Sequence, residues 1–333
     1  MTQCREVRLK SRPNGMPTHD NFEICEVEVA DPGPGQVLVR NHYMSVDPYM
    51  RGRMYDRKSY VPPFQVGAAL DGGAVGEVIA SNSDALPVGA FVQNGFGWRE
   101  AFVAEPRQLQ PVDPEVAPLS AYLGVLGMPG MTAYVGLFRA ASLKDGETVF
   151  VSGAAGAVGS LAGQIAKIKG CRVLGSAGSD EKVRHLTDDL GFDYAFNYRE
   201  GDLLARLREG APDGLDVYFD NIGADHLEAA LFHMRQFGRI ALCGAIAVYN
   251  DATPRPGPSN LTMAIGMGLR LQGFIVNHYN DSRDDFIRDV SGWIAEGKVK
   301  YDETILDGID QAPAAFEGLF TGRNVGKMLV KLI

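Results

Sequence analysis

The sequence has few cysteines and no long apolar run. Its 333 residues include only Cys4, Cys25, Cys171 and Cys243, and no two are close enough to form a CxxC pair. Neither a structural zinc lobe nor a disulfide framework is therefore expected. No apolar stretch approaches the roughly 20 residues that cross a bilayer, and the N-terminus lacks the apolar core of a secretory signal. We therefore expect a cytoplasmic protein with no membrane partner.

A basic block and metal-binding histidine spacing are also missing. The formal net charge is −9, and lysine and arginine are dispersed, so nucleic acid is not an expected partner. The six histidines show no HExxH or similar spacing, and we predict no metal site. The composition, with 45% hydrophobic and 22% charged residues, is typical of a globular protein. Its length favours two domains.

The chain changes pattern near residue 125. Before it, short apolar stretches are separated by glycine and proline, which indicates a small β barrel or sandwich. After it, strands alternate with helical runs, which is typical of a doubly wound parallel sheet and an α/β fold class. The segments 51–67 and 249–260 are long enough to be mobile loops over a site. We predict strands at 149–152, 172–176, 194–197, 215–221, 238–244 and 269–276, and helices at 161–169, 181–190, 202–209, 224–234, 259–267 and 284–297.

A glycine-rich turn follows the first predicted parallel strand. The strand VFVS leads into Gly153, Gly156 and Gly159, and a helical run follows. Glycine at these positions allows a tight turn, close approach of the backbone to a pyrophosphate, and close packing of helix on strand. The pyrophosphate then binds the N–H groups that begin the helix. This context predicts a dinucleotide-binding site.

The end of the next strand favours NADP(H). An NAD site usually has an acidic residue about 20 residues after the glycine turn, where it binds the ribose 2′-hydroxyl. Here Gly178 and Ser179 precede the first acid, Asp180, which we interpret as a helix N-cap. Lys182 and Arg184 follow and are candidates to bind a 2′-phosphate. The alternative is that both are solvated helix residues.

Long segments of the chain resemble a known family. They are SVDPYMRGRM (45–54), GMPGMTAYVGL (127–137), the glycine-turn segment 153–182, YFDNIG (218–223), GRIALCGAIAVYN (238–250) and GRNVGKMLVKL (322–332). They are similar to the medium-chain dehydrogenase/reductase superfamily, in its zinc-independent branch. That branch includes prostaglandin reductase (leukotriene B4 12-hydroxydehydrogenase), alkenal double-bond reductases and curcumin-reductase-like enzymes. Zinc-dependent relatives have a cysteine where this chain has Ser45-Val46-Asp47.

The resemblance implies a fold and a reaction. It implies a GroES-like β-rich barrel domain for substrate at 1–125 and 300–333, a Rossmann NADP(H) domain at 126–299, and a homodimer. The implied reaction is NADPH-dependent reduction of the C=C bond of an α,β-unsaturated aldehyde or ketone, with hydride going to the β-carbon without a metal. One alternative is a quinone oxidoreductase of the same superfamily. A second is a non-catalytic NADPH-binding protein.

The resemblance also implies site residues. Lys182 would meet the 2′-phosphate, Tyr198 would lie at the adenosine end, and Asn221 would contact the ribose. Tyr249, at the carboxyl edge of the sheet, is the first candidate to stabilise the enolate oxygen, and Tyr49 is the second; the alternative for each is a packing role. The residues predicted to bind the cofactor are Gly153, Ala155, Gly156, Ala157, Val158, Gly159, Gly178, Ser179, Lys182, Tyr198, Asn221, Cys243, Gly244, Ala245, Ile246, Tyr249, Phe274, Ile275, Val276 and Asn324.

Overall fold

The computed structural model describes all 333 residues, which divide into two compact units. The first unit comprises Met1–Gly124 and Glu303–Ile333, and the second comprises Val125–Asp302. The end of the chain therefore returns to the unit in which the chain begins. No helix in either unit has the length and apolar character needed to cross a membrane.

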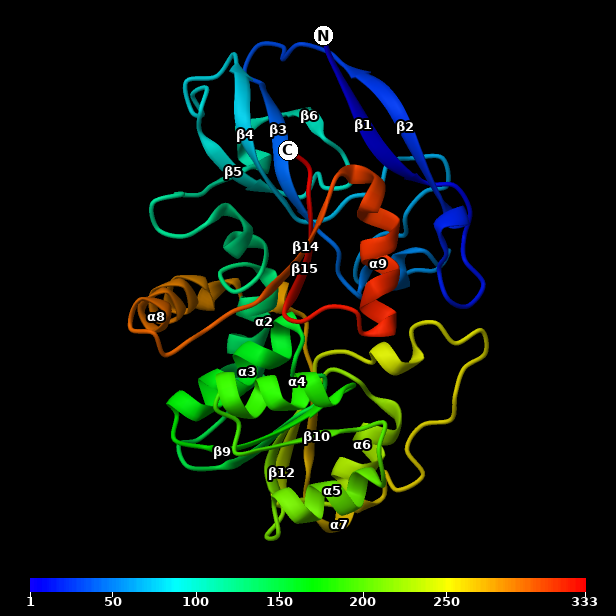
Figure 1. Cartoon of the computed structure of the whole chain (residues 1–333), viewed down its shortest axis with the longest axis vertical. Helices are drawn as coiled ribbons and strands as arrows, with labels where there is room; N and C mark the ends of the chain where they lie inside the picture. Colours follow the sequence, from blue (N-terminus) through cyan, green and yellow to red (C-terminus); the bar gives the residue numbers. More distant parts are fainter. The chain divides into compact units, whose positions relative to one another are not determined.

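The first unit consists mainly of antiparallel strands (Figure 1). Its strands are β1 (Thr2–Leu9), β2 (Phe22–Val29), β3 (Val37–Ser45), β4 (Ala74–Ser81), β5 (Phe91–Asn94), β6 (Ala101–Ala104), β7 (Gln110–Pro111), β14 (Glu303–Asp307) and β15 (Lys327–Lys331). Its helices are η1 (His19–Asn21), α1 (Met50–Arg53), η2 (Pro106–Gln108), η3 (Leu119–Leu123), η8 (Ile309–Gln311) and α9 (Ala312–Thr321).

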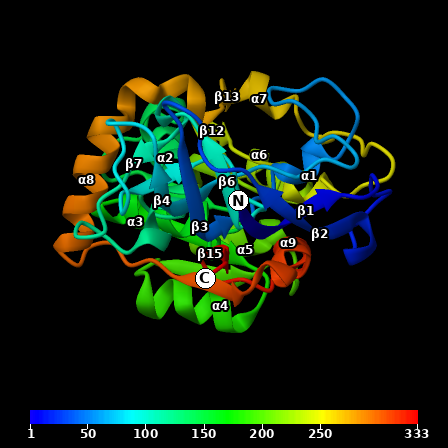
Figure 2. The ribbon, with the colours of Figure 1, turned by 90° about the horizontal axis from the view of Figure 1, so that it is seen from above.

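The strand β3 is central in the main sheet of this unit, because it pairs with β15, β4 and β6. Seven strands form one sheet in the order β14-β15-β3-β4-β5-β7, with β6 also paired to β3. The strands β1 and β2 form a separate antiparallel ribbon (Figures 1 and 2). Leu9 of β1, Phe22 of β2 and Phe316 of α9 share one buried cluster with Trp98, so the helix closes the core beside the ribbon.

Arginines cross-link the long loop at 51–67. The guanidinium of Arg12 donates to the carbonyl oxygens of Met54 (2.9 Å) and Phe64 (3.0 Å). Arg53 donates to the carbonyl oxygen of Pro62 (2.9 Å) and forms an ion pair with Asp71. This loop is therefore held to the unit at several points, although its length predicted a mobile segment.

The second unit is a parallel sheet covered by helices. Its strands are β8 (Thr148–Val151), β9 (Arg172–Ala177), β10 (Tyr194–Asn197), β11 (Leu215–Asp220), β12 (Met234–Leu242) and β13 (Arg270–Gly273). Its helices are α2 (Met128–Val135), η4 (Gly136–Ala140), α3 (Ala157–Ile168), α4 (Asp180–Arg184), η5 (His185–Asp189), α5 (Leu203–Gly210), α6 (Ala224–Leu231), η6 (Ile246–Val248), α7 (Met263–Gly266), η7 (Val276–Ser282) and α8 (Arg283–Ala295).

The order of the parallel strands is β10-β9-β8-β11-β12-β13. This is the order of doubly wound dinucleotide-binding folds, in which ligands bind at the carboxyl ends of the strands. Alternate residues face opposite sides of the sheet. Tyr218 packs in the core under α5 and α6, whereas the next residue, Phe219, lies against Gly136 at the end of α2. The predicted α/β fold class is confirmed.

The predicted helix at 259–267 is shorter in the structure. Only Met263–Gly266 is helical. Before it, the Ser259 hydroxyl donates to the Glu228 carboxylate (2.6 Å), and the Asn260 amide donates to the Glu228 carbonyl oxygen (2.8 Å). These side-chain bonds hold the segment to α6 in a non-helical conformation.

Candidate active site

The glycine turn between β8 and α3 has the geometry of a dinucleotide site. Gly153 has a φ of +60°, which favours glycine. A Cβ on Gly159 would lie 2.5 Å from the Gly153 carbonyl oxygen, so α3 can pack this close to the turn only with glycine there. Gly156 is the N-cap of α3, and the helix begins with free N–H groups suited to a pyrophosphate. The predicted Ala155 lies in the same turn, and the predicted Ala157 and Val158 are the first two residues of α3.

Positive charge gathers at the carboxyl end of β9. Lys182 is half-buried, and burial together with the nearby Arg199 guanidinium lowers the pKa of its amine. Arg199 lies 5.9 Å from the centre of the Tyr198 ring. A Cβ on Gly178 would lie 3.2 Å from the Tyr198 hydroxyl, so this ring packs on the turn after β9. Two neighbouring cations beside an aromatic ring fit a phosphate group. Arg184, the other residue predicted as a candidate for the 2′-phosphate, is exposed.

Two details here differ from the sequence analysis. The N-cap of α4 is Ser179, whose hydroxyl accepts the Lys182 N–H at 3.4 Å. The N-cap prediction for Asp180 was wrong, because the helix begins at Asp180 itself, which accepts a hydrogen bond from the Asn197 amide (3.0 Å). Arg199 was missed, although its position directly after Tyr198 was a usable signal.

A neutral histidine supports this end of the site. His226 of α6 is buried, its Nε2 lies 3.1 Å from the Ser176 hydroxyl, and its ring makes an edge contact with Tyr198 at 5.1 Å. Burial lowers the pKa of His226 to about 4. The uncharged imidazole therefore connects β9 to the tyrosine predicted at the adenosine end.

The buried imidazole predicts acid sensitivity. An unfolded histidine has a pKa of about 6.5, so below that pH the unfolded chain binds a proton that the folded chain excludes until about pH 4. Between pH 7.5 and 5, this group should lower the free energy of unfolding by about 2 kcal/mol. Urea unfolding of the wild type and of His226→Gln at both pH values measures the difference. An equal pH dependence in both proteins would contradict this role.

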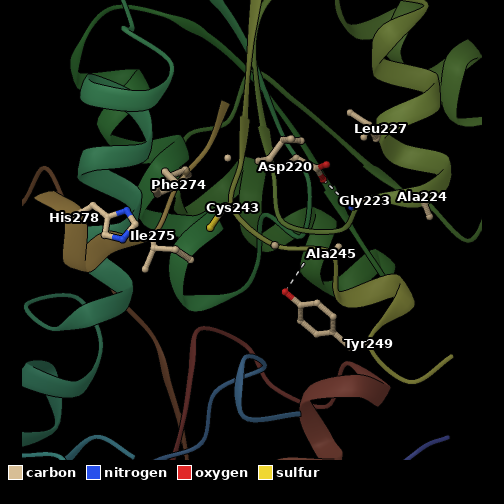
Figure 3. A pocket seen from close by; sticks show the side chains of 13 residues that line it. Asp220, Gly223, Ala224, Leu227, Cys243, Ala245, Tyr249, Phe274, Ile275 and His278 are labelled. Atoms are coloured by element: carbon tan, nitrogen blue, oxygen red, sulfur yellow. Dashed lines mark hydrogen bonds between the residues drawn. The ribbon is translucent and has the colours of Figure 1, made fainter. Parts of the chain in front are cut away.

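A cavity of about 580 Å³ lies at the carboxyl ends of β11, β12 and β13 (Figure 3). Six residues of the predicted cofactor set line it, namely Cys243, Gly244, Ala245, Tyr249, Phe274 and Ile275. Three others, Asn221, Ile246 and Val276, are adjacent in sequence to lining residues but do not line the cavity themselves. The wall consists of Asp220, Gly223, Ala224, Leu227, Leu242, Cys243, Gly244, Ala245, Tyr249, Gly273, Phe274, Ile275 and His278.

Tyr249 is fixed by a bond within its own turn. The short helix η6 brings its ring back toward β12, where its hydroxyl accepts the Ala245 N–H at 3.1 Å (Figure 3). Burial raises the pKa of Tyr249. The hydroxyl therefore keeps its proton at neutral pH, and a hydroxyl that accepts one hydrogen bond can still donate another.

The end of β11 is tied to the end of β8. The Asn221 amide donates to the Ser152 carbonyl oxygen (2.8 Å), and the Asn221 N–H donates to the Ser152 hydroxyl (3.0 Å). Asp220 accepts bonds from Tyr218, Ser152 and the N–H groups of residues 222 and 223. Sequence reasoning missed Asp220. The available signal was an acidic residue at the end of an apolar strand.

Two predicted site residues belong to the first unit. Tyr49 lies in the turn between β3 and α1, where burial, reinforced by the Asp47 carboxylate, raises the pKa of its hydroxyl. Asn324 lies between α9 and β15 and donates to the Gly326 carbonyl oxygen (2.8 Å).

The segment where zinc-dependent relatives have a cysteine contains a buried ion pair. Lys327 Nζ donates to Asp47 Oδ1 (3.1 Å) and to the Val46 carbonyl oxygen (2.8 Å), and Ser45 Oγ donates to the other oxygen of Asp47. No group of three or more His, Cys, Asp or Glu side chains in the chain is arranged to bind a metal ion. The polar groups here are therefore satisfied by one another.

Comparison with known proteins places the chain among reductases. Residues 5–112 match the family model described as the N-terminal domain of oxidoreductase, and residues 157–295 match the model described as zinc-binding dehydrogenase. NADPH-dependent curcumin reductase of Escherichia coli (strain K12) is 41% identical, over 97% of this chain and 95% of that protein. The NADP(+)-dependent 2-alkenal reductase of Nicotiana tabacum is 44% identical, over 98% of this chain and 96% of that protein.

A solved structure agrees with these relatives. The crystal structure of CurA in complex with NADPH from Vibrio vulnificus superposes with a TM-score of 0.95, at 38% identity, over 99% of each chain. Relatives above 40% identity over nearly the whole chain, together with this shared fold, establish the family. The chain belongs to the zinc-independent branch of the medium-chain dehydrogenase/reductase superfamily, together with the curcumin, prostaglandin and 2-alkenal reductases.

Proposed function

We propose that this protein is an NADPH-dependent reductase of the C=C bond in α,β-unsaturated aldehydes and ketones. The observation that carries the proposal is the cavity at the carboxyl ends of β11–β13, which holds a protonated tyrosine and lies in the same unit as the dinucleotide turn. Relatives named NADPH-dependent curcumin reductase and 2-alkenal reductase support both the cofactor and the reaction class.

Each part of the cofactor has proposed partners in the chain. The glycine turn holds the pyrophosphate, Lys182 and Tyr198 hold the adenosine 2′-phosphate end, and Asn221 holds the ribose. The segments 243–246 and 274–276, with Tyr249, hold the nicotinamide half. Asn324, in the first unit, is a further proposed cofactor residue. In this proposal the second unit carries most of the NADP(H) contacts and the first unit binds substrate.

The chain must stabilise an oxygen that becomes negative. Bound NADPH supplies the hydride, and electron density then moves to the carbonyl oxygen of the substrate. Tyr249 is the proposed hydrogen-bond donor to that oxygen, because its hydroxyl stays protonated and already accepts the Ala245 N–H. Bonds in such a chain strengthen one another. Tyr49 is the second proposed donor.

The first experiment measures oxidation of NADPH and of NADH at 340 nm. The substrates are trans-2-nonenal and a simple quinone. Consumption of NADPH with the enal, yielding the saturated aldehyde, and weak use of NADH are expected. Turnover of the quinone alone would assign the chain to the quinone-reducing branch. Tight NADPH binding without turnover of either substrate would favour a non-catalytic binding protein.

We also propose a cytoplasmic homodimer. The outer edge of β13 is unpaired. Exposed apolar side chains lie near it, one on the neighbouring strand β12 and one on α7, which Figure 2 shows beside β13. Phe237 is 68% exposed and Ile265 is 84% exposed, and such patches mark interfaces.

Light scattering is expected to give about 72 kDa, twice the chain mass of 36.0 kDa. The variant Ile265→Glu should shift the protein toward the monomer. Val88→Glu, at a valine of the first unit that is 62% exposed, is the matched control. A 36.0 kDa wild type would contradict the dimer.

A further inference from the structure

Asp220 places a carboxyl group in the wall of the cavity. It is the last residue of β11 and is only 1% exposed. A buried carboxylate is costly unless hydrogen bonds compensate the lost water. The distribution of its bonds therefore indicates what the group does.

All four hydrogen bonds reach the same oxygen, Oδ1. The donors are the Tyr218 hydroxyl (2.6 Å), the Gly223 N–H (2.8 Å), the Ile222 N–H (3.0 Å) and the Ser152 hydroxyl (3.3 Å). The other oxygen, Oδ2, has no hydrogen-bond partner in the chain, and no lysine, arginine or histidine forms an ion pair with the group. Burial raises the pKa of Asp220, while the four donors favour its ionised form.

An ionised Asp220 brings to the cavity a negative charge that no cationic side chain pairs. The nicotinamide ring is neutral in NADPH and positively charged in NADP⁺. A carboxylate in a partly water-excluded site attracts the charged ring and leaves the neutral ring almost unaffected. The same attraction acts on the charge that develops while the hydride is leaving.

We propose that Asp220 is an electrostatic residue of the nicotinamide site, an inference that rests on the proposed function. Its carboxylate stabilises the positive charge of the ring and so promotes hydride donation. Asp220 therefore favours NADP⁺ over NADPH in binding, apart from any effect on turnover.

The test compares the Kd values of the two cofactor forms in Asp220→Asn. The Kd of NADPH is measured by its fluorescence and that of NADP⁺ by calorimetry. The ratio of the NADPH Kd to the NADP⁺ Kd should fall about tenfold, which equals about 1.4 kcal/mol. Asp216→Asn is the matched control. Asp216 also lies on β11, but it accepts the Thr148 N–H (2.9 Å) and pairs with Arg235 (2.7 Å) outside the cavity wall. Its ratio should match the wild type.

Equal changes in both Kd values would show a structural role only and would overturn the proposal. If Asp220→Asn does not fold, Tyr218→Phe removes the shortest bond to Oδ1. Loss of this donor raises the pKa of Asp220 further, so a smaller fraction of the group is ionised and the ratio should fall about threefold. An unchanged ratio in that variant would overturn the proposal as well. A wild type that binds both cofactor forms but reduces no enal would refute the proposed function, while the Kd ratio would still decide the role of Asp220.

Discussion

Replacing Lys182 with alanine is expected to weaken NADPH binding about 100-fold and to leave the Kd of NADH within about twofold. The reason is that the Lys182 ammonium, with Arg199 beside it, forms the cationic end of the proposed site. Removing one partner of a charge-assisted contact to phosphate costs about 2–3 kcal/mol. NADH lacks the 2′-phosphate, so it makes no such contact and its Kd should not rise. Fluorescence titration with each dinucleotide measures the two Kd values.

Arg184→Ala is the control for this prediction. Arg184 lies on the same short helix as Lys182 but is exposed, so its loss should change the Kd of NADPH less than threefold at moderate salt. Arg199→Ala should raise the Kd of NADPH about tenfold, which lies between the effects of Lys182→Ala and Arg184→Ala. If Lys182→Ala weakens NADH as much as NADPH, the lysine supports the fold of the site and does not select the phosphate.

The features that sequence predicted well have local causes. The glycine turn depends on a conformation and a close approach that only glycine allows at Gly153 and Gly159. The strands of the second unit are short apolar runs buried on both faces of a parallel sheet, as at Thr148–Val151. Because each signal lies within a few residues, one sequence is enough to read it.

The features that sequence missed depend on contacts between distant segments. Asp220 matters because Ser152, 68 residues earlier, and the turn after β11 converge on one of its oxygens. The helix predicted at 259–267 is shorter in the structure because the side chains of Ser259 and Asn260 form hydrogen bonds with Glu228 of α6. Neither contact leaves a periodic pattern in the sequence, so propensity and spacing could not indicate it.

Tyr249→Phe is expected to lower kcat for trans-2-nonenal about 100- to 1,000-fold, the usual cost of removing one donor to a developing oxyanion. The substitution removes only the hydroxyl, so the Kd of NADPH should change little. Burial raises the pKa of Tyr249 above its ordinary value of 10.0. The wild-type hydroxyl therefore stays protonated as the pH rises, and kcat should show no alkaline loss from this group below about pH 10. Steady-state rates from pH 6 to 9.5, with NADPH saturating, measure the fall in kcat and its pH dependence.

Tyr279→Phe separates this role from a general loss of tyrosine hydroxyls near the sheet edge. Tyr279 lies on η7, where its hydroxyl accepts the Gln272 amide at 3.3 Å, and it does not line the cavity. Its variant should keep kcat within about twofold.

An unchanged kcat in Tyr249→Phe would remove Tyr249 as the donor and leave Tyr49 as the remaining tyrosine candidate. A fall in kcat together with a matching rise in the Kd of NADPH would instead mean that the Tyr249 hydroxyl holds the segment 243–249 in place. The cause of that loss would be the missing hydrogen bond between the Ala245 N–H and the Tyr249 hydroxyl. Measuring kcat and the Kd of NADPH on the same variant distinguishes a donor role from this positioning role.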